Sequence, residues 1–161
     1  MERRMSRVAT ATAGVLLLAG SLLAGTADAA DGTQGFGPTL ACNGLASLDD
    51  PTTATGAGTA VQGPASSVGT AQVRYGSVNG VQYGWARALN GATNRWIRFE
   101  VDTNGDRNWD CGSWYGPLNS TRYWTSGTQT SSSSSVAFRA CIVPEGVRCA
   151  DSGAASVTSW W

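Results

Sequence analysis

Hydrophobic and polar positions alternate most clearly from residue 95 onwards, in the segment that reads RWIRFEV. A period of two residues is typical of a β-strand with one face buried in a core. The apolar side chains of one face are Ile97, Phe99 and Val101, and the side chains of the opposite face are Trp96, Arg98 and Glu100. We therefore predict a strand over residues 95–101 whose first face is buried.

Asn104 and Gly105 follow this strand inside a run of short polar residues, and aromatic residues return from residue 108 to residue 115. An Asn-Gly pair accommodates the positive φ angles of a tight type I′ turn, so we predict a β-hairpin closed at this dipeptide. The register of its second strand stays open, because a shift by one residue exchanges the faces of Trp109 and Trp114.

Large and small residues alternate in the segment from Val81 to Leu89, which Asn90 and Gly91 follow. We predict that this segment is a strand paired with residues 95–101 across the turn, with its large side chains in the same core. The opposite face would then place Trp96 over the small residues of the preceding strand.

Further short strands are predicted at residues 73–75, 121–125, 136–143 and 157–161, separated by glycine- and serine-rich segments. Short strands at regular spacing without a helical period indicate an all-β fold, a small antiparallel sandwich or barrel. We expect the β domain to span residues 71–161.

The N-terminal region reads as a secretory signal peptide over residues 1–29. Three arginines precede an apolar run over residues 15–23, and Ala27-Asp28-Ala29 forms a small-x-small cleavage pattern. The apolar run is too short for a membrane span, so we expect a secreted chain. Residues 30–70 contain few large apolar side chains, which predicts an irregular arm that is either extended or partly disordered.

Four cysteines, Cys42, Cys111, Cys141 and Cys149, predict two disulfides in an exported protein. Three pairings are possible. We favour Cys141 with Cys149, which closes a short loop, and Cys42 with Cys111, which attaches the arm to the predicted hairpin. Reactive or metal-binding thiols are disfavoured because no C-x-x-C spacing is present.

The composition narrows the possible chemistry. The formal net charge is +0, which gives no electrostatic basis for nucleic-acid binding. The chain contains no histidine and no lysine, which excludes a histidine base, a lysine Schiff base and histidine metal ligands. Catalysis would need a carboxylate pair that includes Glu100, and the other acidic residues are predicted to lie in exposed loops. We therefore predict a protein that is not an enzyme and has no cofactor.

The segment from Asp102 to Asp110 has an oxygen-bearing side chain at every second position, as calcium loops do. However, Arg107 occupies the sixth position, where such loops need glycine, and Ser113 occupies the twelfth, where they need glutamate. We favour a solvated loop whose Asn and Asp residues form turns, and the alternative of calcium binding stays open.

The aromatic content indicates either core packing or a sugar-binding surface. The candidate ligand-binding residues are Trp96, Arg98 and Glu100, because an indole can stack on a sugar while charged neighbours bond its hydroxyls. Core packing is the simpler explanation for the other aromatic residues. Arg87 is expected either to pair with a carboxylate or to extend to the sheet edge.

Several pieces of the chain resemble a group of small secreted actinobacterial (Streptomyces-type) proteins of uncharacterised function. These pieces are Val73-Arg74-Tyr75, Tyr83 to Arg87, Val101-Asp102 with Asn108-Trp109, Arg139-Ala140-Cys141 and the terminal Ser159-Trp160-Trp161. The resemblance implies an exported all-β fold and no specific activity. The architecture also resembles the small bridging subunits of actinobacterial umbrella toxin particles.

These observations predict a secreted, non-catalytic binding or structural module that acts through a protein partner, for example as a small subunit or adaptor of a larger secreted assembly. The first alternative is a carbohydrate or cell-wall glycan binder that uses Trp96. The second is an extracellular inhibitor or weak hydrolase that depends on Glu100.

Overall fold

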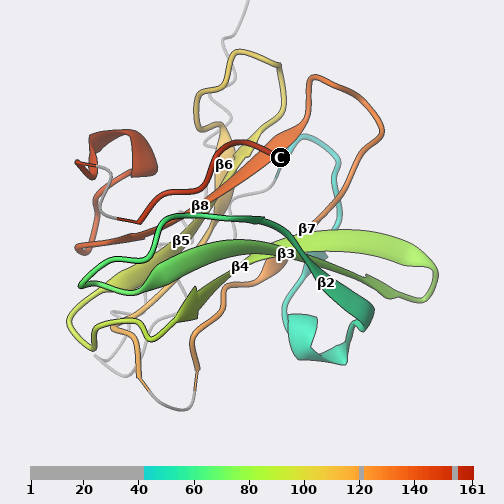
Figure 1. Ribbon diagram of the computed structural model, residues 1–161. Coiled ribbons are helices and arrows are strands. Elements are labelled where there is room, and N and C mark those ends of the chain that lie inside the picture. The colour runs from blue at the N-terminus through green and yellow to red at the C-terminus, as the bar shows by residue number, and fades with distance from the viewer. Residues whose placement is uncertain (1–41, 120–121, 154–155) are drawn as a thin grey trace, which may run out of the picture. The chain divides into compact units, whose positions relative to one another are not determined.

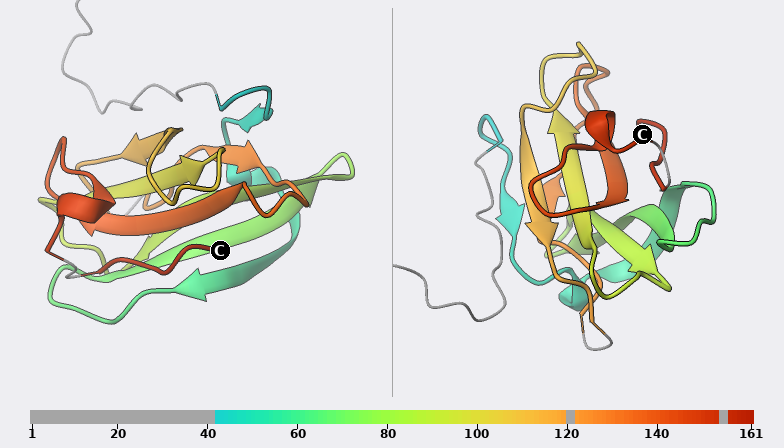
Figure 2. Two further views of the ribbon diagram at one scale, coloured as in Figure 1. Left: turned by 90° about the horizontal axis from the view of Figure 1, so that it is seen from above. Right: turned by 90° about the vertical axis from the view of Figure 1, so that its left-hand side faces the viewer.

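The computed structural model describes residues 42–119, 122–153 and 156–161, which form two antiparallel β-sheets packed as a sandwich (Figures 1 and 2). The five-stranded sheet has the order β1-β7-β4-β3-β2, with β1 at Ser47–Leu48, β2 at Thr55–Gln62, β3 at Thr70–Val78, β4 at Val81–Leu89 and β7 at Gly127–Gln129. The three-stranded sheet has the order β6-β5-β8, with β5 at Trp96–Asp102, β6 at Cys111–Tyr115 and β8 at Ala137–Val143. The predicted all-β fold is confirmed.

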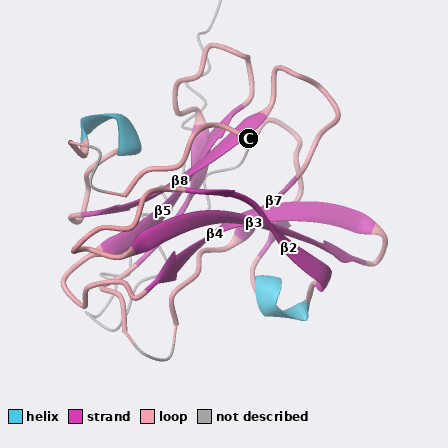
Figure 3. Cartoon of the chain, viewed as in Figure 1, coloured by secondary structure: helices cyan, strands magenta, loops and turns pink. Residues whose placement is uncertain are grey.

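The helical content of the described residues consists of two single turns, η1 at Pro51–Thr53 and η2 at Cys149–Asp151 (Figure 3). Neither turn has the length or the apolar character that a membrane-crossing helix requires.

The core between the sheets is formed by the predicted face of β5 and by the small side chains of β4. Ile97, Phe99 and Val101 are fully buried, as the alternation predicts. Opposite them, Ala86 and Ala88 belong to the same apolar cluster. The prediction that the large side chains of residues 81–89 face this core is therefore wrong. Bulky phenylalanines on the three-stranded sheet fill the space that the small side chains of β4 leave.

The predicted pairing of β4 with β5 is also wrong, because the two strands lie in different sheets. β4 pairs with β3 and β7, whereas β5 pairs with β6 and β8. Residues 90–95 cross between the sheets. Their backbone hydrogen bonds join residues within this segment or connect it to the segments around Val68 and Leu118. Ala92 N–H donates to the carbonyl of Val68, and the Arg95 carbonyl accepts from the N–H of Leu118.

The tight turn predicted at Asn104-Gly105 is replaced by a longer loop over residues 103–110. β5 and β6 pair from Ile97 opposite Tyr115 to Val101 opposite Cys111, which leaves this loop outside the ladder. A two-residue hairpin turn does occur in the chain, at Asn79-Gly80 between β3 and β4. Both residues have positive φ angles there, 51° and 79°, as a type I′ turn requires.

The predicted boundary at residue 71 lies inside the five-stranded sheet. β2 belongs to the region predicted to be an irregular arm, yet it pairs with β3 and forms the edge of the sheet. Glycine makes this pairing possible, because a Cβ at Gly58 would lie 2.5 Å from Cζ of Tyr75. In the sequence alone, the small residues of this region argue against a packed core. In the structure, a small residue leaves space for the ring of Tyr75. The predicted signal peptide and residues 30–41 lie outside the described residues.

Both favoured disulfides are confirmed. Cys42 is bonded to Cys111 with a Cα–Cα distance of 5.4 Å, and Cys141 is bonded to Cys149 with a distance of 5.5 Å. The first bond attaches the segment before β1 to β6. The second folds the loop after β8 back onto that strand, which brings this loop over the outer face of the three-stranded sheet.

The C-terminal residues run along the free edge of β8, but the strand predicted at 157–161 is reduced to an isolated bridge between Val157 and Cys141. Phe138 and Trp161 exchange two backbone hydrogen bonds of 2.9 Å, and Thr158 N–H donates to the carbonyl of Ala140 at 2.9 Å. The ring of Trp161 stacks on Tyr75 and packs against Phe138. This segment therefore closes one end of the core.

Candidate functional site

Glu100 is the centre of a buried ionic cluster on the outer face of β5. Its side chain is fully buried, and one carboxylate oxygen accepts hydrogen bonds from Arg98 Nε and from the backbone N–H of Cys149, both at 2.9 Å. The other oxygen accepts from Arg139 at 2.6 Å and 3.1 Å. All of these donors belong to the protein, so this carboxylate is engaged as a structural acceptor.

Arg98 carries this cluster outward by stacking between indole rings. Its Cζ lies 4.7 Å from the ring centroid of Trp109 and 5.4 Å from that of Trp114. Arg148 covers Trp109 as well, at 4.5 Å. Guanidinium groups and indoles at such distances attract each other through the ring quadrupole, so the four side chains hold one another in place.

A groove of about 390 Å³ lies over this stack. We call it the Trp–Arg groove and define it by the side chains that carry its chemistry: Trp96, Arg98, Trp109, Trp114 and Arg148. Its remaining wall is the loop over residues 143–147. The disulfide between Cys141 and Cys149 closes this loop over the sheet.

Trp96 reaches the groove by lying directly on the backbone of Gly116. A Cβ at position 116 would come within 2.5 Å of the Cγ of Trp96, which real Cβ atoms do not do. The glycine therefore lets the indole lie flat against the chain after β6. Trp96 is half-buried, so part of its ring faces solvent.

Two of the three predicted ligand-binding residues, Trp96 and Arg98, line the groove, whereas Glu100 lies beneath it. Glu100 is buried beneath the groove because it forms ion pairs with Arg98 and Arg139, which would otherwise be buried without a counter-charge. Trp109 and Trp114 also line the groove. Their faces could not be assigned from the sequence, because the register of the second hairpin strand was open. The sequence analysis missed Arg148. The signal for it was the short Cys141–Cys149 loop, which folds back onto β8.

The groove does not present the pair of carboxylates that hydrolysis of glycosidic bonds requires. Glu145 is the only carboxylate among the described residues that line it, and this side chain is exposed. General acid catalysis needs a carboxyl group kept protonated by apolar surroundings. The chemistry that the groove offers is stacking and hydrogen-bond donation.

The loop that resembles a calcium site uses its oxygens to organise its own backbone. Asp102 accepts hydrogen bonds from the N–H groups of Asn104, Gly105 and Arg107 and from the Arg107 side chain. Burial alone would raise the pKa of Asp102, but these hydrogen bonds outweigh it and lower the pKa below its ordinary value. No group of three or more potential metal-ligating residues occurs in the described part of the chain.

Comparison of the chain with protein-family models, with curated proteins and with solved structures gave no match.

Proposed function

We propose that the protein is a secreted, non-catalytic binding domain that holds a carbohydrate of the cell wall in the Trp–Arg groove. The observation that carries this proposal is the arrangement of three indoles around one groove, with a guanidinium fixed between two of them. A volume of about 390 Å³ lies within the range of small-ligand sites.

The side chains of the groove match the two faces of a sugar. An indole offers a flat apolar surface for the C–H groups of the ring, while guanidinium N–H groups donate to hydroxyl and acetamido oxygens. Arg98 is already held by Glu100 and by two indoles, so little side-chain entropy is lost when a ligand binds.

The extracellular location is part of the proposal. Two disulfides are typical of proteins that fold in an oxidising compartment, and the N-terminal pattern of the sequence favours export. A wall glycan is a ligand that such a protein would meet.

The test is retention of the purified protein on insoluble peptidoglycan and on chitin. We expect Trp96→Ala and Trp114→Ala each to reduce retention several-fold, because each removes one stacking surface. Trp161→Phe is the control, since it changes an indole that is 39% exposed and outside the groove but keeps an aromatic ring against Phe138. Equal retention of all three variants, with unchanged circular dichroism spectra, would refute the proposal.

A protein partner is the second candidate, and the edge of β2 favours it. This eight-residue strand ends one side of the five-stranded sheet, and an extended segment of a partner can add to such an edge. Two irregularities in its register bend the strand and oppose indiscriminate pairing. Capture of one stoichiometric partner that is lost after Ala57→Pro, at a β2 position outside the register with β3, would support this alternative over the glycan.

A further inference from the structure

Arg74 and Arg87 lie on the outer face of the five-stranded sheet, on neighbouring strands. Arg74 pairs with Trp85 and Arg87 pairs with Gln72 in the ladder between β3 and β4, so the four side chains share one face. Both arginines are half-buried. Burial lowers the pKa of Arg74, and the positive charge of Arg87 lowers it further.

Neither arginine forms an ion pair with any described residue. Arg74 donates a hydrogen bond to the hydroxyl of Thr59, and Arg87 Nε donates to the side-chain carbonyl of Gln72 at 3.1 Å. The expectation that Arg87 either pairs with a carboxylate or extends to the sheet edge is wrong for the described chain, where an uncharged amide takes the carboxylate's place. Two adjacent cations without a counter-charge favour an anion from outside the protein.

The guanidinium of Arg87 is held in a fixed position. Gln72 is 5% exposed, and its amide nitrogen donates to the side-chain carbonyl of Gln62, which fixes the direction of the Gln72 carbonyl toward Arg87. Only Nε of Arg87 is used by these contacts. The two terminal nitrogens keep the fork geometry that matches a carboxylate.

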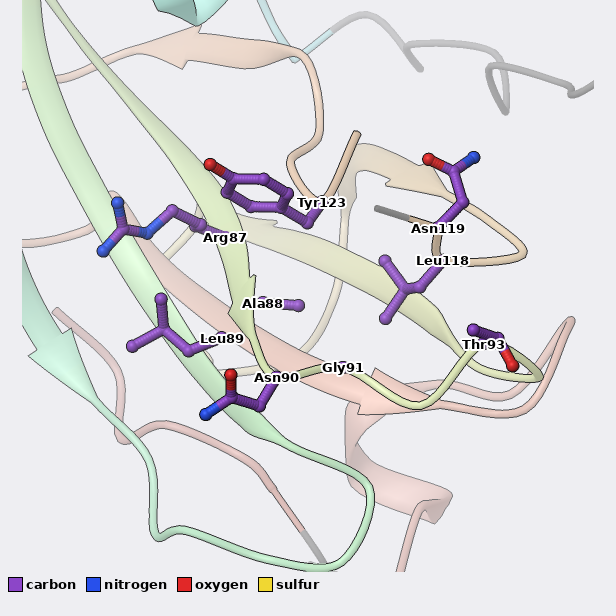
Figure 4. Close-up of a pocket in the computed structure, with 9 residues that line it drawn as sticks. All are labelled: Arg87, Ala88, Leu89, Asn90, Gly91, Thr93, Leu118, Asn119 and Tyr123. Carbon is purple, nitrogen blue, oxygen red and sulfur yellow. The ribbon is translucent and has the colours of Figure 1, made fainter. Parts of the chain in front are cut away.

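Two adjoining cavities surround this pair. A cavity of about 240 Å³ is lined by both arginines together with Trp85, Tyr123 and Trp124. A second cavity of about 430 Å³ shares Arg87 and Tyr123 with the first and adds the polar side chains of residues 90, 93 and 119. In Figure 4 the ring of Tyr123 lies beside Arg87, whose guanidinium points away from the wall formed by residues 118 and 119.

We propose that this face binds an acidic saccharide, with the carboxylate of a uronic acid held between Arg74 and Arg87. We call it the Arg74–Arg87 site. The aromatic rings of Tyr123 and Trp124 supply a stacking surface, and the amide and hydroxyl side chains of the larger cavity bond the hydroxyls of the neighbouring sugar. These uncharged polar groups favour a saccharide over an acidic peptide. The Arg74–Arg87 site lies on the five-stranded sheet and the Trp–Arg groove on the three-stranded sheet. Evidence for or against ligand binding at one site therefore does not decide binding at the other.

The experiment is isothermal titration of the full chain carrying Trp96→Ala and Trp114→Ala, which removes two stacking surfaces of the Trp–Arg groove. The ligand is hyaluronan tetrasaccharide, which alternates glucuronate with N-acetylglucosamine. Chitotetraose is the neutral counterpart, and a tetraglutamate peptide presents carboxylates without sugar. We expect the uronate-containing tetrasaccharide to bind at least tenfold more tightly than either of these probes, and less tightly as salt increases.

The variants are Arg87→Gln and Arg74→Gln, with Arg87→Lys as the conservative change. Each glutamine variant is expected to weaken binding about tenfold or more, because a hydrogen-bonded charge is lost, and the lysine variant is expected to recover only part of the affinity. Arg107→Gln is the matched control, since it removes the same charge from the distant Asp102 loop. Equal affinities of Arg87→Gln and Arg107→Gln, or tighter binding of tetraglutamate than of the saccharide, would overturn the assignment.

Discussion

Replacing Glu100 with glutamine isolates the ionic contribution of the buried cluster, because the two side chains have nearly the same volume and no cavity is created. The substitution leaves Arg98 and Arg139 without a counter-charge while their side chains are only 8% and 14% exposed. Removal of one partner from a buried ion pair costs about 3–5 kcal/mol, and here two arginines lose the same partner. We therefore expect Glu100→Gln to lower the free energy of unfolding by about 3–5 kcal/mol, a large fraction of a typical domain's stability.

The assay is equilibrium unfolding in urea at pH 7, followed by far-UV circular dichroism. The midpoint should fall while the dependence of the free energy on urea concentration stays unchanged, since the exposed surface is the same. Glu145→Gln is the matched control, because that carboxylate is exposed and its loss should change stability by less than about 0.5 kcal/mol. If Glu100→Gln behaves like this control, the two guanidiniums do not need the carboxylate and the reasoning is wrong.

Three further predictions concern the loop, the groove and the longer disulfide. The lowered pKa of Asp102 stabilises the fold above about pH 4, and this stabilisation is lost as the pH falls further. Asp102→Asn should therefore be less stable at pH 7 and show a flatter acid-unfolding curve. Identical acid-unfolding curves of the variant and the wild type would contradict this. Gly116→Ala should displace the indole of Trp96 and reduce glycan retention several-fold without unfolding the domain, and unchanged retention would show that the indole does not bind. The double change Cys42→Ser with Cys111→Ser should cost about 4 kcal/mol in urea unfolding, because the bond closes a sequence separation of 69 residues; a cost under about 1 kcal/mol would contradict the chain-entropy explanation.

The strands could be predicted from the sequence more reliably than their partners. The dipeptide Asn-Gly occurs at residues 43–44, 79–80, 90–91 and 104–105, and local chemistry gives each the same tendency to turn. Both residues have positive φ angles at 43–44, where the turn is flanked by an isolated bridge between Cys42 and Leu45, and at 79–80, where it joins β3 to β4. At 90–91 the chain crosses between sheets, and at 104–105 it is one part of a loop organised by Asp102. Pairing over long distances decides between these outcomes, and periodicity does not report it.

Only part of the candidate site could be predicted from the sequence, because several of its contacts also depend on pairing over long distances. The alternation in β5 shows that Trp96 and Arg98 lie on the face opposite the core, because the residues that alternate with them are apolar. It does not reveal that Glu100 is buried, because the donors that surround it include, besides Arg98, Arg139 of β8 and the backbone N–H of Cys149. The position of Arg148 depends on the disulfide, which the cysteine spacing suggests but does not orient.

The placement of three indoles on the outer face of the three-stranded sheet affects what tryptophan fluorescence can report. The inter-sheet cluster of described residues contains phenylalanine and tyrosine but no tryptophan. Trp96, Trp109 and Trp114 lie instead around the groove, two of them in contact with a guanidinium. Emission from these rings therefore follows events at the surface of the three-stranded sheet. The other four tryptophans include Trp85, which is 5% exposed, and Trp161, which packs against Phe138. A fluorescence titration therefore observes the groove in the part of the emission that Trp96→Ala or Trp114→Ala removes.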